Sequence, residues 1–179
     1  MRMEDNLKKI CSASIDIKNC IESDEYLCDR LNSIDKIKDT GNSYGFEPSY
    51  IFNQYLDKLK SKILEINSNI DDLTNVNAFV REYKNNDFLK KHIDRTDIST
   101  TISICLESTI NKEWPICAEI NNQPHCFNMD TGDGILLFNA DKIVHWRDVL
   151  ICNENERVLQ FFLHWIPVSY PIKKRKTLL

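Results

Sequence analysis

The chain has 179 residues, of which 42% are hydrophobic and 28% charged, and its formal net charge is −4. This composition predicts one globular domain over residues 1–179 and excludes the disordered and fibrous classes. The negative balance offers no general attraction to nucleic acid, and the longest wholly apolar run, 135–138, is too short to cross a bilayer.

The first 75 residues are predicted to be mainly helical. The clearest helix is expected over 47–70, with Pro48 near its start, where the missing N–H costs little. Apolar side chains then recur at three- and four-residue spacing and make one stripe, formed by Ile51, Tyr55, Leu59, Ile63 and Ile66. We therefore expect a helical section that packs one face on a core.

Beyond residue 75 the spacing of apolar residues changes to the period of 2 that is typical of strands. Strands are expected over 78–83, 101–107, 135–138, 142–147 and 157–166, with turns between them. The pattern predicts an α+β fold, with a double-stranded β-helix (jelly-roll) core over 76–168 and the helical section packed on it. The basic tail, 169–179, is interpreted as a solvated end.

The segment MRMEDNLKKI is charged and is not followed by an apolar stretch, so a secretory signal is not expected. The seven cysteines lack C-x-x-C spacing and are interpreted as reduced thiols. Both observations favour a cytoplasmic protein.

Three residues of metal-ligand type stand out: His92, Asp94 and, 53 positions later, His145. In extended backbone, residues two apart project from the same face, so His92 and Asp94 can act as neighbouring ligands. Two imidazoles and a carboxylate form the facial triad of non-haem Fe(II) oxygenases, which leaves positions open for a co-substrate and O2. A surface His-x-Asp pair and a hydrogen-bonded core histidine are the alternative interpretation of these residues.

Further motifs follow in a fixed order: Trp114-Pro115, then Gly132–Phe138, then His145-Trp146-Arg147-Asp148, then Gln160–Trp165. Together with the triad, this run resembles the catalytic core of the Fe(II)- and 2-oxoglutarate-dependent dioxygenases, the broad group that includes prolyl hydroxylases. It is similar in particular to small oxygenases with an H-W-R segment. The resemblance covers roughly residues 76–168.

The resemblance implies that His92, Asp94 and His145 are catalytic residues that bind iron. It also implies a basic residue after the last histidine that pairs with the far carboxylate of 2-oxoglutarate, and Arg157 matches this position. The segment before Arg157 is longer than in the family pattern, so Arg147 stays open as the partner. Tyr83 is a candidate to hydrogen-bond the co-substrate or, alternatively, an aromatic residue that caps the barrel. His164 either lines the cavity or lies in the core.

The implied activity is that of a dioxygenase with Fe(II) as cofactor and 2-oxoglutarate and O2 as co-substrates. Its expected reaction is hydroxylation of a C–H bond in a peptidyl side chain or small metabolite, with release of succinate and CO2. No nucleic-acid or membrane partner is expected. The alternative is a non-catalytic jelly-roll module that binds a ligand or a protein.

Overall fold

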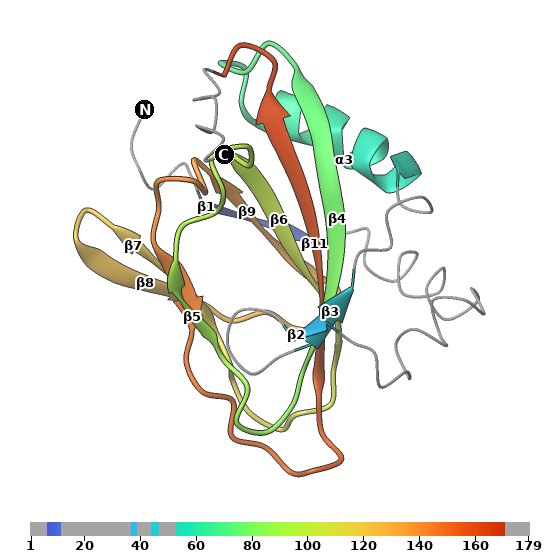
Figure 1. Ribbon diagram of the computed structural model, residues 1–179, viewed down its shortest axis with the longest axis vertical. Helices are drawn as coiled ribbons and strands as arrows, with labels where there is room; N and C mark the ends of the chain where they lie inside the picture. The colour runs from blue at the N-terminus through green and yellow to red at the C-terminus, as the bar shows by residue number, and fades with distance from the viewer. Residues whose placement is uncertain (1–6, 12–36, 39–43, 47–52, 171–179) are drawn as a thin grey trace, which may run out of the picture.

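The computed structural model describes residues 7–11, 37–38, 44–46 and 53–170. Its core is two facing antiparallel sheets, with one helix, α3 (Asn53–Ile66), packed on the larger sheet (Figure 1). From β4 onward, consecutive strands pass back and forth between the sheets, except for the β7–β8 hairpin. This is the double-stranded β-helix that the strand pattern predicted.

The larger sheet has seven strands, in the order β1-β9-β6-β11-β4-β3-β2. Their bounds are β1 Leu7–Cys11, β2 Ile37–Lys38, β3 Tyr44–Phe46, β4 Leu73–Tyr83, β6 Thr100–Ser108, β9 Asp133–Phe138 and β11 Val158–Pro167.

The smaller sheet has four strands, in the order β5-β10-β7-β8. Their bounds are β5 Leu89–His92, β7 Ile116–Ile120, β8 Gln123–Phe127 and β10 His145–Arg147.

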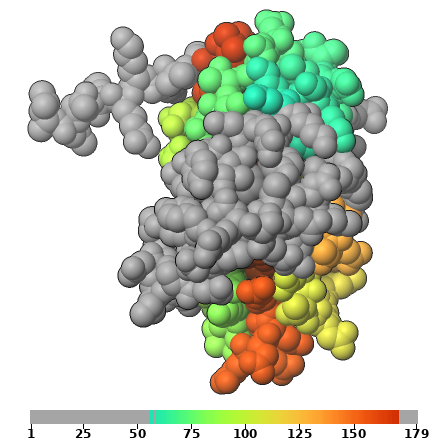
Figure 2. Space-filling view, turned by 90° about the vertical axis from the view of Figure 1, so that its right-hand side faces the viewer, coloured from blue at the N-terminus to red at the C-terminus, as the bar shows by residue number. Residues whose placement is uncertain are grey.

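Side chains along β11 point alternately to the two faces of the larger sheet, so each face carries a different set of residues. Leu159, Phe161 and Leu163 point outward and pack with the apolar stripe of α3, whose Leu59 and Ile63 are buried. Gln160, Phe162 and His164 alternate with them and therefore lie on the face toward the smaller sheet. In the vertical direction of the two views, α3 and the connection from β10 to β11 lie at opposite ends of the molecule (Figures 1 and 2).

The N-terminal section differs from the prediction in two respects. Its helix spans 53–66, shorter than the expected 47–70, and the expected start at Pro48 lies outside the described residues. Three short strands precede the helix in the described parts, where helix was expected, and all three join the larger sheet. β1 pairs with β9 and β3 with β4, while β2 pairs with β3, and local spacing does not reveal the long-range pairings with β9 and β4.

The interpretation of all cysteines as reduced thiols is wrong for one pair. Cys117 on β7 and Cys126 on β8 form a disulfide. The hairpin turns at Asn121 and Asn122, with φ of 53° and 60°, and this two-residue turn sets Cys117 directly opposite Cys126. Cys105 and Cys152 are free, Cys11 ends β1, and Cys20 and Cys28 lie outside the described residues.

Among the described residues, no helix is long and apolar enough to cross a membrane.

Candidate metal centre and adjoining cavity

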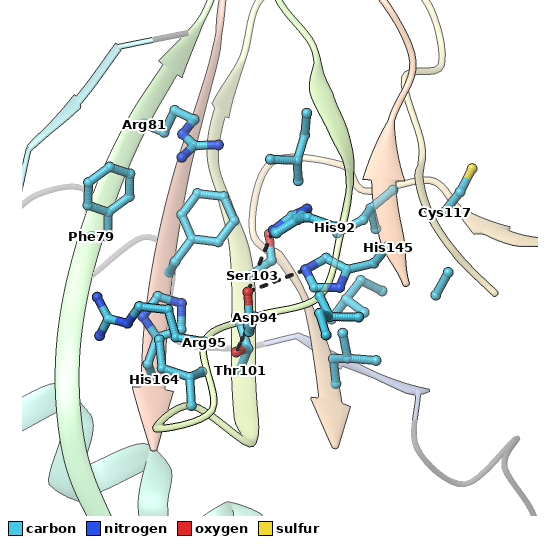
Figure 3. Close-up of a pocket in the computed structure, with 18 of the residues that line it drawn as sticks. Phe79, Arg81, His92, Asp94, Arg95, Thr101, Ser103, Cys117, His145 and His164 are labelled. Atoms are coloured by element: carbon cyan, nitrogen blue, oxygen red, sulfur yellow. Dashed lines mark hydrogen bonds and ion pairs between the residues drawn. The ribbon is translucent and has the colours of Figure 1, made fainter. Parts of the chain in front are cut away.

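The three predicted ligands meet between two neighbouring strands. His92 ends β5, His145 begins β10, and the register of this antiparallel pair sets the two histidines opposite each other. Asp94 follows two residues after His92, and one potential ligand atom from each residue lies within 4.8 Å of the others. Figure 3 shows the three side chains pointing toward one another.

Backbone carbonyls hold both imidazoles in the orientation that a metal requires. Nδ1 of His92 lies 2.9 Å from the carbonyl oxygen of Lys90, and Nδ1 of His145 lies 2.9 Å from that of Ile143. Because a carbonyl only accepts, each Nδ1 carries the proton and each Nε2 presents a lone pair. Both Nε2 atoms lie 3.6 Å from Oδ1 of Asp94.

The carboxylate of Asp94 is oriented by Thr101, whose hydroxyl donates to Oδ2 at 2.8 Å. Burial opposes ionisation of Asp94, but the adjacent His92 and His145 and the Thr101 hydroxyl hold the pKa of its carboxyl at about 2. Burial also lowers the pKa of His145, against the charge of Asp94. At neutral pH the carboxylate is therefore ionised and His145 neutral, the states that bind a metal. The donor set fits Fe(II).

A cavity of about 370 Å³ opens beside the three ligands. Every strand from β4 to β11 contributes to its wall, which places it inside the jelly roll. Much of the wall is aliphatic and aromatic, including Leu89, Ile98, Ile135, Leu137 and Phe162. A mostly apolar cavity with a few polar groups is the usual form of a small-molecule site.

Arg81 is a buried cation on this wall that the sequence analysis missed. It projects from the inner face of β4, is 6% exposed, and its Nη1 donates to the phenol oxygen of Tyr83 at 3.0 Å. Its guanidinium lies 5.2 Å from the ring centroid of Phe79 and 5.7 Å from that of Phe162. Its position two residues before Tyr83 in a strand was the available signal, because alternate residues share a face.

Arg157, the first predicted partner of 2-oxoglutarate, does not line this cavity. Its Nε donates to Glu107 at 3.0 Å and its Nη1 to Glu82 at 3.2 Å. Both carboxylates belong to the strands that flank β11, so the guanidinium links three strands of the larger sheet.

Arg147, the second predicted partner, also lies outside the cavity wall and faces a separate cavity of about 500 Å³. Its guanidinium donates to the backbone oxygen of Trp114 at 2.7 Å and to Gln160 at 3.3 Å. Burial lowers the pKa of Arg147 to about 10.

Tyr83 and His164 were each assigned two alternative roles. Tyr83 is fully buried, packs edge-on against Trp114 at 4.9 Å between ring centroids, and reaches the cavity only through Arg81. His164 does line the cavity, and its Nδ1 bonds to Oδ1 of Asn77 at 2.8 Å. Burial lowers the pKa of His164 to about 4, so the ring is neutral.

No family model and no curated protein matches the sequence. Solved structures do match. A Pseudomonas putida prolyl-4-hydroxylase is 13% identical, with a TM-score of 0.61 over 89% of this chain and 92% of its own. The viral collagen prolyl hydroxylase of Paramecium Bursaria Chlorella virus-1, in a 2-oxoglutarate complex, is 16% identical, with a TM-score of 0.59 over 89% and 96%.

HygX from Streptomyces hygroscopicus, with nickel, 2-oxoglutarate and hygromycin B bound, is 11% identical, with a TM-score of 0.66 over 92% of this chain and 84% of its own. All three align over nearly the whole chain. The protein therefore has the fold of the Fe(II)- and 2-oxoglutarate-dependent oxygenase structures. At these identities the likeness establishes the fold, and the function is argued from the site.

Proposed function

We propose that this protein is an Fe(II)- and 2-oxoglutarate-dependent dioxygenase in which His92, Asp94 and His145 bind the iron. The observation that carries the proposal is the orientation of the three ligands. Both Nε2 lone pairs and one carboxylate oxygen converge beside a cavity, and each ligand is held by its own hydrogen bond. The fold supports it, because the similar structures include oxygenases and hydroxylases.

When bound, iron with 2-oxoglutarate and O2 supplies the oxidation of a C–H bond, with release of succinate and CO2. The protein supplies the geometry. Carbonyls of Lys90 and Ile143 keep the imidazole protons on Nδ1, and Thr101 keeps one oxygen of Asp94 engaged so that the other faces the histidines. The apolar wall excludes water from the reaction.

We propose that Arg81, instead of Arg157 or Arg147, binds the far carboxylate of 2-oxoglutarate. Arg81 is the buried arginine on the wall of the cavity that contains the triad, whereas Arg157 is engaged by two glutamates and Arg147 faces the other cavity. A guanidinium makes two charge-assisted hydrogen bonds to one carboxylate. Tyr83 then acts as a positioning residue, because its hydroxyl holds Nη1 of Arg81.

The substrate is proposed to be a peptidyl side chain or a small metabolite. The similar structures include a prolyl hydroxylase from Trichoplax adhaerens in complex with a hypoxia inducible factor peptide fragment, and HygX with hygromycin B. We further propose a single domain, 1–179, in the cytoplasm. Disulfides are uncommon there, so the oxidation state of Cys117 and Cys126 in protein isolated with its thiols trapped tests this location.

The decisive experiment adds Fe(II) and 2-oxoglutarate to the protein without O2 and records the visible spectrum. A weak metal-to-ligand charge-transfer band is expected, and admission of O2 should then yield succinate. Asp94→Ala should show neither. A wild-type protein without band and succinate would contradict the proposal and favour a non-catalytic binding module.

A further inference from the structure

A second arginine, Arg95, lines the same cavity as Arg81. Figure 3 shows the two guanidinium groups at different ends of the group of side chains that surrounds the triad. Arg81 is 6% exposed, whereas the side chain of Arg95 is 47% exposed. Ile93, two residues before Arg95, also lines the cavity and is 48% exposed. Arg95 therefore lies at the open mouth, and Arg81 lies inside.

Strand geometry separates the two arginines. Asn77 and Arg81 lie on one face of β4, four residues apart, which corresponds to about 13 Å of extended strand. Asn77 is bonded to His164, and the charges of both arginines lower the pKa of that ring, that of Arg95 more than that of Arg81. The polar groups of the cavity thus form an inner set at Arg81 and an outer set at Asn77, His164 and Arg95.

One molecule of 2-oxoglutarate cannot serve both sets. Its five-carbon chain spans only about 5 Å from end to end, because it contains four bonds of about 1.5 Å. When one end of the molecule binds at the triad and the other end binds Arg81, no part of it can also contact Arg95. Asp94 is the only acidic residue among the described residues of the wall, and it faces the imidazoles. The positive charge of Arg95 is therefore available to a different molecule.

We infer that Arg95, His164 and Asn77 bind the primary substrate, and that this substrate carries a carboxylate beside an N–H donor, as in a free or N-acylated aliphatic amino acid. The inference rests on the proposed function. Arg95 takes the carboxylate. Oδ1 of Asn77 accepts from Nδ1 of His164, which leaves Nε2 of that ring as the acceptor for the N–H. The apolar wall receives the aliphatic part.

The existing partner of Arg95 leaves room for this ligand. Asp97 pairs with Nε at 3.0 Å and with Nη2 at 3.5 Å. Nη1 has no hydrogen-bond partner among the described residues, and exposed ion pairs of this kind are weak. Asp97 thus orients the guanidinium without occupying all of its donors.

The test compares N-acetyl-L-leucine with N-acetyl-L-leucinamide, which differ only in the charged group. Their affinities for the anaerobic Fe(II)–2-oxoglutarate complex are measured by ligand-observed NMR. The wild type should bind the acid about tenfold or more tightly than the amide. Arg95→Gln should remove this preference, and Arg95→Lys should retain part of it. Lys84→Gln, the loss of an exposed charge just beyond the end of β4 and outside the cavity wall, should leave the preference intact.

The co-substrate band separates the two possible failures. Arg95→Gln should keep the affinity for 2-oxoglutarate within about twofold, which also shows that the variant is folded. Absence of the band in the wild type would reject the proposed function itself. A normal band with equal affinities for acid and amide, with no binding of the acid, or with the preference intact in Arg95→Gln would reject the substrate subsite alone.

Discussion

The two faces of the larger sheet have different compositions although the same strands build both. On the outer face, Ile102, Ile104, Phe161 and Leu163 belong to one buried apolar cluster that also includes residues of α3. On the inner face, the residues that alternate with them include Thr101, Ser103, Gln160 and His164, together with Arg81 of β4. The comparison indicates that the outer face stabilises the fold, while the inner face holds charged and hydrogen-bonding groups for chemistry. Substitutions on the two faces should therefore affect different measurements.

Asp94→Ala should have the largest effect, a complete loss of succinate formation, because the remaining imidazoles lack the anionic ligand. The melting temperature of the metal-free protein should change little, since Asp94 is near the inner cavity and not in the outer core. Iron binding and thermal unfolding measure the two effects. If Asp94→Ala instead lowered the melting temperature and left iron binding unchanged, the proposed division between the two faces would be wrong.

Phe161→Ala should lower the free energy of unfolding by about 3–5 kcal/mol, because the ring is fully buried on the outer face. Urea unfolding measures this loss. The inner-face control is Ser103→Ala, which removes one hydrogen bond to Gln160 and should cost about 0.5–1.5 kcal/mol. Equal costs for the two variants would contradict the comparison.

Arg81→Gln should weaken 2-oxoglutarate binding roughly 10- to 150-fold, the equivalent of a charge-assisted hydrogen bond of about 1.5–3 kcal/mol. Titration of the visible band at fixed iron measures the affinity. Arg157→Gln serves as the matched control, because it removes a guanidinium that is paired to Glu82 and Glu107 away from the cavity. A larger loss of 2-oxoglutarate affinity in Arg157→Gln would instead indicate that Arg157 binds the co-substrate, as the family pattern implied.

Thr101→Val should have the smallest effect, a loss of about tenfold in Fe(II) affinity, because the hydroxyl only orients Asp94. The isosteric valine preserves the packing of β6, so the free energy of unfolding serves as the control. An unchanged iron affinity, measured by competition with a chelator, would show that the carboxylate is held by other contacts.

The sequence predicted those elements whose apolar residues recur with a regular spacing along the chain. The alternation of 101–107 became β6, and the apolar stripe of 47–70 became the buried face of α3 within shorter bounds. The strands β5, β7 and β8 were not predicted. β5 reads Leu-Lys-Lys-His, and β8 is mostly exposed, so neither has an alternating apolar pattern. Their positions depend on pairing with β10 and β7.

The sequence alone supplied the candidate ligands, because two imidazoles and a carboxylate are the donor set of a facial triad. It also determined the jelly-roll class, because period-2 alternation obliges strands to bury one face. The tertiary structure decided which arginine faces the triad, since Arg81, Arg147 and Arg157 carry the same charge and differ only in what packs around them. It also decided the pairing of Cys117 with Cys126, because a register between strands is a long-range property.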